Sequence, residues 1–422
     1  MVQILFISPY YPPEKGAAAV CVSENARRLA QRGHQVTVLT TVPNYPTGIV
    51  PPEYRGHALQ AEMLDGVRVV RVWSYSSANR GFFRRLLAHF SFGFMAPLLG
   101  SRSVGRPDII IVQSPPLFDA IAVRLLAWIK RSPYIFMVSD LWPESAVQLG
   151  ALHNRFFIRL AEWLEWSTYR RAKLVWVVTE GIRTRLLQRG LSSERLFLLT
   201  NGVDTTTFHP LSQEQARQEL GWDERFTVIY VGTHGLSHGL ATVLDAAERL
   251  KEHTNLRFVL IGDGAEKPQL VTQARQRQLT NISFLEPQAH HRVPLFLAAA
   301  DLCLVHVRNI PLFTGMLPIK MYEAMACGKP LILAVDGEAR QVAEQKAGAA
   351  VYVEPENAQA LADAICSLQH SPEQLQVMGS RGRALVEEQF SYDQLVLKLE
   401  ARIVALLQEE APQLREITPV LH

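Results

Sequence analysis

Short apolar runs recur along the whole chain, and each is followed by a polar loop and then by a helical stretch. Parallel strands that are covered on both faces read as such uninterrupted apolar runs. A first series of runs lies at 2–7, 33–41, 67–73, 108–114, 134–138 and 174–178. A second series lies at 226–231, 258–261, 282–285, 302–305 and 331–335. This alternation predicts an α/β chain with two doubly wound parallel sheets.

The length and the charge distribution agree with two domains. A chain of 422 residues is expected to form two or three domains. We place an N-terminal domain at 1–195 and a C-terminal domain at 196–389. Lys and Arg outnumber Asp and Glu by 24 to 13 in residues 1–195, a net charge of +11, whereas the remainder carries −8. A basic half and an acidic half suggest different partners for the two domains.

The cysteines and the first residues bear on the compartment. Cys21, Cys303, Cys327 and Cys366 are scattered without metal-ligand spacing or a disulfide framework, which predicts a reducing cytoplasm. Residues 1–9 have no basic leader region and break at a proline. We therefore interpret them as a first strand rather than a signal peptide.

Residues 318–333 carry the most informative motif. Pro318 opens a helix whose apolar residues recur at three and four positions, and Gly328 ends it. The start of a helix presents unpaired N–H groups that suit a phosphate. Lys320 adds a positive charge there, and Glu323 could accept hydrogen bonds from sugar hydroxyls. Alternatively, Glu323 merely favours the helix start and Lys320 is a solvated charge.

The same stretch resembles the donor-nucleotide helix of family 4 glycosyltransferases, and the resemblance spans nearly the whole chain. Members often read Glu, seven residues, Glu, then Ala-x-Ala-x-Gly-x-Pro; Glu323 matches the second Glu, but Gly315 replaces the first. A subgroup that builds bacterial surface polysaccharides reads Pro-x-Lys-x-x-Glu, as Pro318, Lys320 and Glu323 do here. The resemblance implies a GT-B fold with two facing Rossmann-like domains. It also implies that the last helical stretch, within 390–422, returns to the first domain.

Other strand-end loops of the C-terminal domain are candidates for donor binding. The family often reads Gly-Arg-Leu-x-x-x-Lys-Gly after the first strand, where this chain has Thr233 and His238 in place of the two cations. His234 or His238 could still donate hydrogen bonds, although a loop histidine is more often structural. The donor-binding candidates are Gly232, Thr233, His234, His238, Gly262, Gly264, Pro287, Pro318, Lys320 and Glu323.

The N-terminal domain should bind the acceptor. Gly16 and Ala17 leave little side-chain bulk before a helix at 17–31, so a ligand could approach that backbone. The resemblance places this loop at the diphosphate and the acceptor, together with Asn44 and Tyr45. Asp140 ends a strand and is the best candidate acid or base, although it could equally be a helix cap. The candidate catalytic residues are thus Lys320, Glu323 and Asp140.

Several classes of chemistry lack support. There is no Asp-x-Asp to hold a divalent ion, and His290-His291 has no carboxylate at helix spacing, so we expect no metal site and no cofactor besides the nucleotide sugar as co-substrate. A Gly-x-Ser-x-Gly elbow is also missing. The basic residues form no known nucleic-acid motif. The remaining alternatives to a glycosyltransferase are a sugar-nucleotide epimerase of GT-B fold and a non-catalytic nucleotide-sugar-binding partner.

Two stretches, 80–106 and 155–173, combine arginines with large aromatic residues. Between Arg85 and Arg102 the uncharged run is shorter than the ~20 residues that span a bilayer. It fits either an interfacial helix with aromatic anchors or a buried helix with arginines at its rim. With the resemblance, we expect a peripheral enzyme at the inner face of the cytoplasmic membrane. It would transfer a sugar from a nucleotide-diphosphate donor, with retention, to a polyprenyl-diphosphate-linked or other glycan acceptor.

Overall fold

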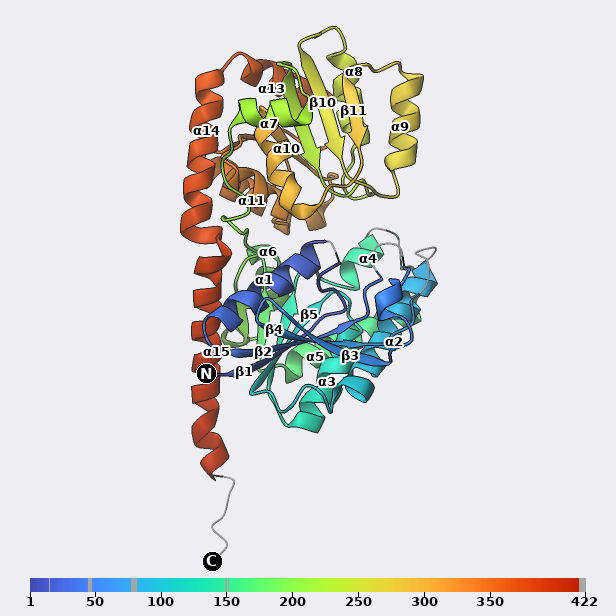
Figure 1. The fold of residues 1–422 in the computed structure, drawn as a ribbon, viewed down its shortest axis with the longest axis vertical. Helices are drawn as coiled ribbons and strands as arrows, with labels where there is room; N and C mark the ends of the chain where they lie inside the picture. The colour runs from blue at the N-terminus through green and yellow to red at the C-terminus, as the bar shows by residue number, and fades with distance from the viewer. Residues whose placement is uncertain (15, 45–47, 77–81, 149, 151, 417–422) are drawn as a thin grey trace, which may run out of the picture. The chain divides into compact units, whose positions relative to one another are not determined.

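The computed structural model describes residues 1–422 except 15, 45–47, 77–81, 149, 151 and 417–422, and it divides into two compact units (Figure 1). Unit 1 comprises Met1–Thr200 and Tyr392–His422, and unit 2 comprises Asn201–Ser391. The sequence prediction placed the boundary between 195 and 196, a few residues before the one observed.

Unit 1 is built on a sheet in the order β3-β4-β2-β1-β5-β6-β7-β8. The strands are β1 (Gln3–Ile7), β2 (Gln35–Thr41), β3 (Leu59–Leu64), β4 (Val67–Val72), β5 (Ile109–Ser114), β6 (Tyr134–Val138), β7 (Leu174–Val177) and β8 (Leu196–Leu198). Neighbours pair in parallel except β3 and β4, which form an antiparallel hairpin. Asp65 and Gly66 both have positive φ at its turn, the conformation that tight hairpins require. The predicted parallel sheet is thus observed, with one antiparallel edge strand, β3, that the sequence analysis did not anticipate.

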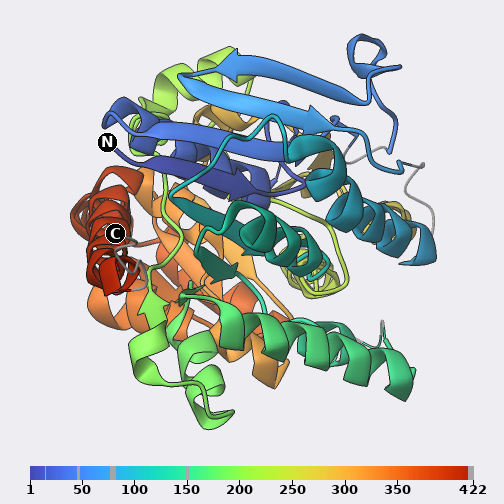
Figure 2. The same cartoon turned by 90° about the horizontal axis from the view of Figure 1, so that it is seen from below.

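Helices cover both faces of this sheet. They are α1 (Ala17–Gln31), α2 (Phe82–Gly100), α3 (Asp119–Lys130), α4 (Glu144–Gln148), α5 (Arg155–Arg171), α6 (Glu180–Gln188) and α15 (Tyr392–Glu416), with short turns η1 (Pro52–Tyr54) and η2 (Ser193–Arg195). Side-chain caps start two of them: Asn154 accepts from the backbone of Phe156 at α5, and Thr179 accepts from that of Ile182 at α6. Helices α2, α3 and α5 lie side by side (Figure 2).

The C-terminal helix α15 belongs to unit 1, although unit 2 precedes it in the chain. Leu395, Leu399 and Ile403 are buried in the same apolar core as the sheet. Arg28 of α1 donates to the carboxylate of Asp393 at 2.6 Å. Apolar burial and the ion pair between Arg28 and Asp393 together hold α15 against α1.

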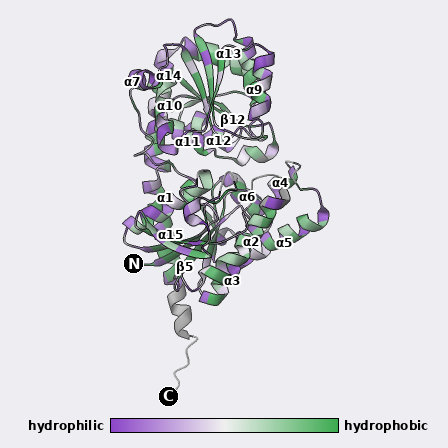
Figure 3. Ribbon diagram, turned by 45° about the vertical axis from the view of Figure 1, so that its right-hand side comes forward, coloured by the Kyte–Doolittle hydropathy of each residue, from purple (hydrophilic) through white to green (hydrophobic). Residues whose placement is uncertain are grey.

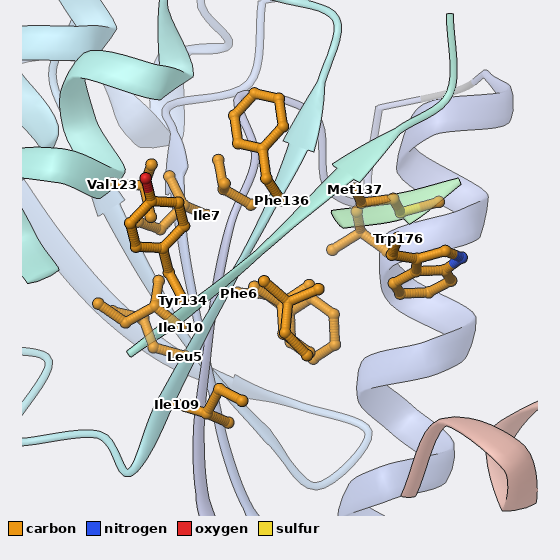
Figure 4. Close-up of a cluster of buried hydrophobic side chains, with 14 of the residues drawn as sticks. Leu5, Phe6, Ile7, Ile109, Ile110, Val123, Tyr134, Phe136, Met137 and Trp176 are labelled. Atoms are coloured by element: carbon orange, nitrogen blue, oxygen red, sulfur yellow. The ribbon is translucent and has the colours of Figure 1, made fainter. Parts of the chain in front are cut away.

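The core of unit 1 lies between the sheet and its helices. Figure 4 shows Phe6, Ile110 and Phe136 from neighbouring strands among its buried side chains. The strands of both units are drawn mainly in the hydrophobic colour in Figure 3. Such continuous apolar strands are what a sheet covered on both faces needs.

Unit 2 contains a fully parallel sheet in the order β11-β10-β9-β12-β13-β14. Its strands are β9 (Phe226–Val231), β10 (Leu256–Ile261), β11 (Ile282–Leu285), β12 (Leu302–His306), β13 (Leu331–Ala334) and β14 (Ala350–Tyr352). Its helices are α7 (Gln213–Leu220), α8 (Ala241–Arg249), α9 (Lys267–Gln276), α10 (Val293–Ala299), α11 (Ile319–Ala326), α12 (Glu338–Arg340), α13 (Ala358–Gln369) and α14 (Pro372–Leu385), with η3 (His290–Arg292), η4 (Pro311–Gly315), η5 (Gln341–Lys346) and η6 (Val386–Phe390).

Each sheet changes its direction of winding at one place. In unit 1, β1 lies between β2 and β5; in unit 2, β9 lies between β10 and β12. The loops that leave the two strands at such a point diverge to opposite faces of the sheet and open a crevice at their carboxyl ends, where ligands of open α/β sheets bind. The loop at Gly16 follows β1, and the loop at Gly232 follows β9. The fold therefore places the loop at Gly16 and the loop at Gly232 each at the switch point of its sheet.

Candidate functional site

Three glycines pack the loops after β9 and β10 against each other. Gly232, Gly262 and Gly264 all have φ between 144° and 159° in the positive region that only glycine adopts readily. A Cβ on Gly262 would overlap the carbonyl oxygen of Gly232, and one on Gly264 would overlap the backbone of His234. These glycines are therefore required for two backbones to lie in contact at the carboxyl edge of the sheet.

Lys320, in the first turn of α11, reaches the loop after β9. Its Nζ donates to the hydroxyl of Tyr230 at 2.7 Å and lies 4.1 Å from the centroid of that ring. A Cβ on Gly232 would be only 2.8 Å from the same Nζ. The lysine thus lies directly against the backbone of a glycine, at the switch point of unit 2.

Burial lowers the pKa of Lys320 from 10.5 to about 7, and Glu323 raises it only in part. The charged form is disfavoured because the ammonium is removed from water without a fully compensating negative charge. We expected a permanent charge from the sequence; instead the structure holds a cation that is marginal at neutral pH. An anion bound beside it would restore the usual pKa.

Glu323 lies one turn further along α11, with its side chain 16% exposed. Burial raises its pKa, and His290 and Lys320 lower it. His290 Nδ1 is 3.9 Å from Oε1 of Glu323, and the His290 ring lies against Phe208. We interpreted His290 as an exposed residue with no carboxylate at helix spacing; in the fold, a carboxylate distant in sequence approaches it.

The predicted histidines also gather near Lys320. His234 is fully buried, and neither ring nitrogen makes a hydrogen bond of standard geometry to the described residues, although the backbone of Ile261 is near enough to raise its pKa slightly. Burial lowers the pKa of His234 to about 4 and that of His238 to about 3, and Lys320 lowers both further. Both rings are therefore neutral at pH 7 and do not replace the cations that the family pattern carries.

The remaining donor-site candidates lie at the same edge of the sheet. Thr233 is exposed, and its carbonyl accepts from the hydroxyl of Tyr230 at 2.8 Å. Pro318 precedes α11, and among the described residues no side chain caps that helix start. Pro287 is exposed in the segment after β11, beside Glu286, which pairs with Lys267 at 2.8 Å. The structure thus brings Gly232, Lys320 and the histidines together and places Pro287 in the segment that follows the edge strand β11.

In unit 1, Gly16 and Ala17 are exposed at the start of α1, at the switch point of the sheet. Asn44 is held near this loop, because its backbone N–H donates to Oε1 of Glu14 at 2.8 Å. Its side-chain amide donates to the carbonyl of Val42 at 3.0 Å. Tyr45, the remaining acceptor-loop candidate, lies outside the described residues.

Asp140 follows β6, and burial raises its pKa while hydrogen bonds from Ser145 and the backbone of Leu141 lower it. These bonds agree with the helix-cap interpretation, since Ser145 belongs to α4.

Two further buried polar residues lie near this end of the sheet, and the sequence analysis did not identify them. Arg71 is buried and joins Glu62 to the carbonyl of Pro12. Asp119 is wholly buried, its oxygens have no partner among the described residues, and burial raises its pKa.

Comparison with known families agrees with this division. Residues 16–202 match the model for a glycosyl transferase 4-like domain, and residues 212–385 match that for glycosyl transferases group 1. The chain belongs to the glycosyltransferases. The enzyme is 28% identical, over 85% of its own length and 90% of the relative's, to the "Putative colanic acid biosynthesis glycosyl transferase WcaI" of Escherichia coli K12. This relative is named as a transferase, as are both matching family models.

Solved structures show that this glycosyltransferase has the GT-B fold. Sucrose-phosphate synthase from Thermosynechococcus elongatus matches with a TM-score of 0.76 at 19% identity, over 97% of this chain and all of that one. Anabaena HepE in complex with UDP-glucose matches with a TM-score of 0.72 at 19% identity, over 96% of this chain and all of that one. The predicted pair of Rossmann-like α/β domains is confirmed.

Proposed function

We propose that the enzyme transfers a sugar from a nucleoside-diphosphate sugar to a lipid-linked glycan during assembly of a cell-surface polysaccharide. The observation that supports donor binding is the position of Lys320, whose pKa is about 7, beside the backbone of Gly232. This arrangement suits an anionic diphosphate. The relative named for colanic acid biosynthesis supports a polysaccharide product, and the neighbour solved with UDP-glucose supports a nucleotide-sugar donor.

In this proposal unit 2 binds the donor. Lys320 and the start of α11 neutralise the diphosphate, and Glu323 accepts hydrogen bonds from the ribose. His234 and His238 are neutral and could act only as hydrogen-bond donors or acceptors. Pro287 follows the edge strand, where it would adjoin the nucleobase. Because Thr233 and His238 supply no charge, Lys320 would supply the positive charge beside Gly232.

Unit 1 binds the acceptor. The backbone at Gly16 and Ala17, with Asn44, would face the acceptor, and Asp140 would orient the acceptor hydroxyl. In the transfer, the bond between the anomeric carbon and the diphosphate breaks with its electrons on the departing oxygen, and the acceptor oxygen bonds to the same carbon. The proton of the acceptor passes to a diphosphate oxygen. Stabilisation of the leaving group permits retention without a protein nucleophile.

A lipid-linked acceptor requires contact with a membrane, and unit 1 has a surface suited to it. Among the described residues, no helix is both long and apolar enough to span a bilayer. Phe90 and Phe94 of α2 and Phe156 of α5 are nevertheless well exposed, whereas Phe92 of α2 is buried in the core. Arg84, Arg155 and Arg159 are exposed on the same helices. Each basic residue near an anionic leaflet contributes about 1 kcal/mol.

The test has a donor arm and an acceptor arm. Nucleotides and nucleotide sugars are screened by thermal shift, since a ligand that binds only the folded state raises its stability. The stabilising donor is then offered with short oligosaccharides attached to polyprenyl diphosphate, with and without EDTA. We expect transfer that EDTA leaves unchanged, since no resident metal is proposed. Isomerised donor formed without acceptor, or tight binding with no turnover, would overturn the proposal.

Membrane association is tested separately by co-sedimentation with anionic and neutral liposomes. The double variant Arg155→Glu, Arg159→Glu should lose the preference for anionic lipid, and the attraction should weaken with salt. Arg292→Glu, which removes a half-exposed arginine of unit 2, is the matched control and should bind as the parent does. Equal partition of the parent onto both lipids would contradict this part.

A further inference from the structure

Helices α2, α3 and α5 lie side by side on unit 1 (Figure 2). An apolar groove crosses the surface between them. Its volume is about 1130 Å³, beyond the range of roughly 300–1,000 Å³ typical of small-molecule sites. Its walls are large apolar side chains, which include Leu87, Phe90, Phe94, Ile121, Phe157 and Trp163. Several of these are half exposed, so the unit leaves a concave apolar surface open to water. Exposed apolar surface of this extent marks a binding site rather than ordinary surface.

Three polar side chains line the groove: His153 is exposed, and Arg124 and Asn154 already have partners. The guanidinium of Arg124 donates to the hydroxyl of Ser167 at 2.9 Å and lies 5.8 Å from the centroid of the Trp163 ring. The side chain of Asn154 caps α5. Burial also lowers the pKa of Arg124. No carboxylate lines the groove within the part of the chain that the structure describes. A ligand in this groove would therefore meet hydrocarbon almost throughout, which favours an apolar chain over a polar molecule.

One end of the groove reaches the acceptor side of the sheet. Leu117 and Phe118 follow β5, and Trp142 follows β6, so these lining residues lie at the carboxyl ends of two central strands. Trp142 is two residues beyond Asp140, the candidate acceptor residue. A chain that lay in the groove would thus place its polar end near the residues proposed to bind the acceptor.

The other feature of the groove is its charged surroundings. Arg155 and Arg159 are exposed in the first turns of α5, and Arg84 is exposed in the first turn of α2. Glu162 is the exposed carboxylate of α5, whereas Glu165 is buried and paired with Arg189. Basic groups outnumber acidic ones around the rim, which suits a lipid that joins an apolar chain to a phosphate or diphosphate.

We propose that this groove binds the hydrocarbon chain of a lipid-linked acceptor, taking the chain segment nearest the diphosphate out of the bilayer. The inference rests on the proposed function, because it gives the lipid of that acceptor a site. A flat bilayer surface cannot fill a concave groove unless a chain enters it, and an unfilled groove forfeits the contacts of its walls. Trp128 and Phe156 are more exposed than the groove side chains and lie outside it. They would contact the surrounding membrane instead.

Two matched pairs separate the groove from the general membrane surface. Phe157 lines the groove and is 51% exposed, whereas its neighbour Phe156 is 70% exposed and does not line it. Trp163 lines the groove and is 58% exposed, whereas Trp128 is 79% exposed outside it. Because all four side chains are at least half exposed, their replacement should leave the fold intact.

The binding probe is labelled farnesyl phosphate, a soluble isoprenoid monophosphate, measured by equilibrium dialysis without vesicles or detergent. The parent should bind it, and Phe157→Ser and Trp163→Ala should each weaken binding about tenfold through loss of apolar contact. Phe156→Ser and Trp128→Ala should bind it as the parent does but partition less onto liposomes. Failure of the parent to bind, or equal loss in both members of each pair, would overturn the proposal.

The transfer assay separates this proposal from the proposed function. If farnesyl phosphate binds through the groove but no sugar is transferred to any lipid-linked acceptor, the proposed transfer reaction is wrong, whereas the groove is still a lipid-binding site. If Phe157→Ser transfers sugar to a polyprenyl-diphosphate acceptor with an unchanged acceptor KM, the groove does not bind the acceptor lipid, whereas the proposed transfer reaction stands. A raised acceptor KM with an unchanged donor KM in that variant would support both.

Discussion

The ammonium of Lys320 donates a hydrogen bond of 2.7 Å to the hydroxyl of Tyr230, on whose ring face it also lies. The same hydroxyl donates to the carbonyl of Thr233 at 2.8 Å. Tyr230 therefore connects the first turn of α11 to the loop after β9. This connection holds a partly desolvated cation beside Gly232, where a diphosphate would be bound.

Removal of this hydroxyl should weaken both the fold and the donor site. Tyr230→Phe loses two hydrogen bonds and leaves Lys320 less well positioned, so we expect a loss of about 1–2 kcal/mol in the free energy of unfolding. Nucleotide affinity should fall several-fold. Denaturant unfolding and calorimetric titration with the donor measure the two effects. Tyr322→Phe is the control, because the Tyr322 hydroxyl is buried without a partner among the described residues and its loss should be neutral or stabilising.

Donor binding should be coupled to uptake of a proton by Lys320. Its pKa is about 7 in the free enzyme, and a diphosphate should raise it. Between pH 8 and 10 the nucleotide affinity should therefore decrease as the pH rises. Titration in two buffers of different ionisation enthalpy counts the protons. Lys320→Met should bind more weakly and take up none over this interval; an unchanged proton count would assign the linkage to another group.

The same group makes a prediction about stability without ligand. The pKa of Lys320 is 10.5 in the unfolded chain and about 7 in the fold, so the unfolded state binds more protons between these values. The contribution of Lys320 to the free energy of unfolding should therefore rise with pH across that window. The difference between the parent and Lys320→Met, measured by urea unfolding at several pH values, isolates this contribution. A flat difference from pH 7 to 10 would mean that the lysine is not desolvated.

Replacement of the Glu323 carboxylate should weaken nucleotide binding while leaving the fold intact. Hydrogen bonds to a charged group are worth about 1.5–3 kcal/mol, so Glu323→Gln should cost roughly tenfold or more in donor affinity. Thermal unfolding of the variant should match that of the parent or exceed it, because burial already disfavours this charge. Glu219→Gln removes an exposed carboxylate of the same unit as a control. Unchanged donor affinity in Glu323→Gln would exclude the ribose role.

The backbone contact between the donor loops should not tolerate a side chain. Gly262→Ala places a Cβ onto the carbonyl oxygen of Gly232 and also imposes positive φ, so we expect about 3 kcal/mol of destabilisation or a failure to fold. Gly221→Ala also has a positive φ, but no atom of the described residues lies within 4 Å of the added Cβ, so it should cost only about 1–2 kcal/mol. Similar losses in the two variants would show that the steric contact contributes little.

Local sequence patterns determined the α/β class, the approximate bounds of α1 and α11, and the glycine loops, because strand and helix periodicity and helix-ending glycines act over a few residues. The resemblance added the donor helix. The antiparallel β3 was not foreseen, since an edge strand buries little and its alternation is weak. Nor does periodicity distinguish the exposed Phe90 from the buried Phe92, because both belong to a helix that is apolar on most sides.

Tertiary structure alone decided which distant groups meet. Tyr230 and Lys320 are ninety positions apart, and β9 and β12 become neighbours only when the sheet forms. The ionisation of Lys320 is likewise a property of its surroundings, since the same side chain in water would remain charged at neutral pH. The groove on unit 1 has the same origin: helices α2, α3 and α5 acquire a common concave face only when they pack on one sheet. Periodicity acts along the chain, whereas burial, charge and cavities depend on what folding brings together.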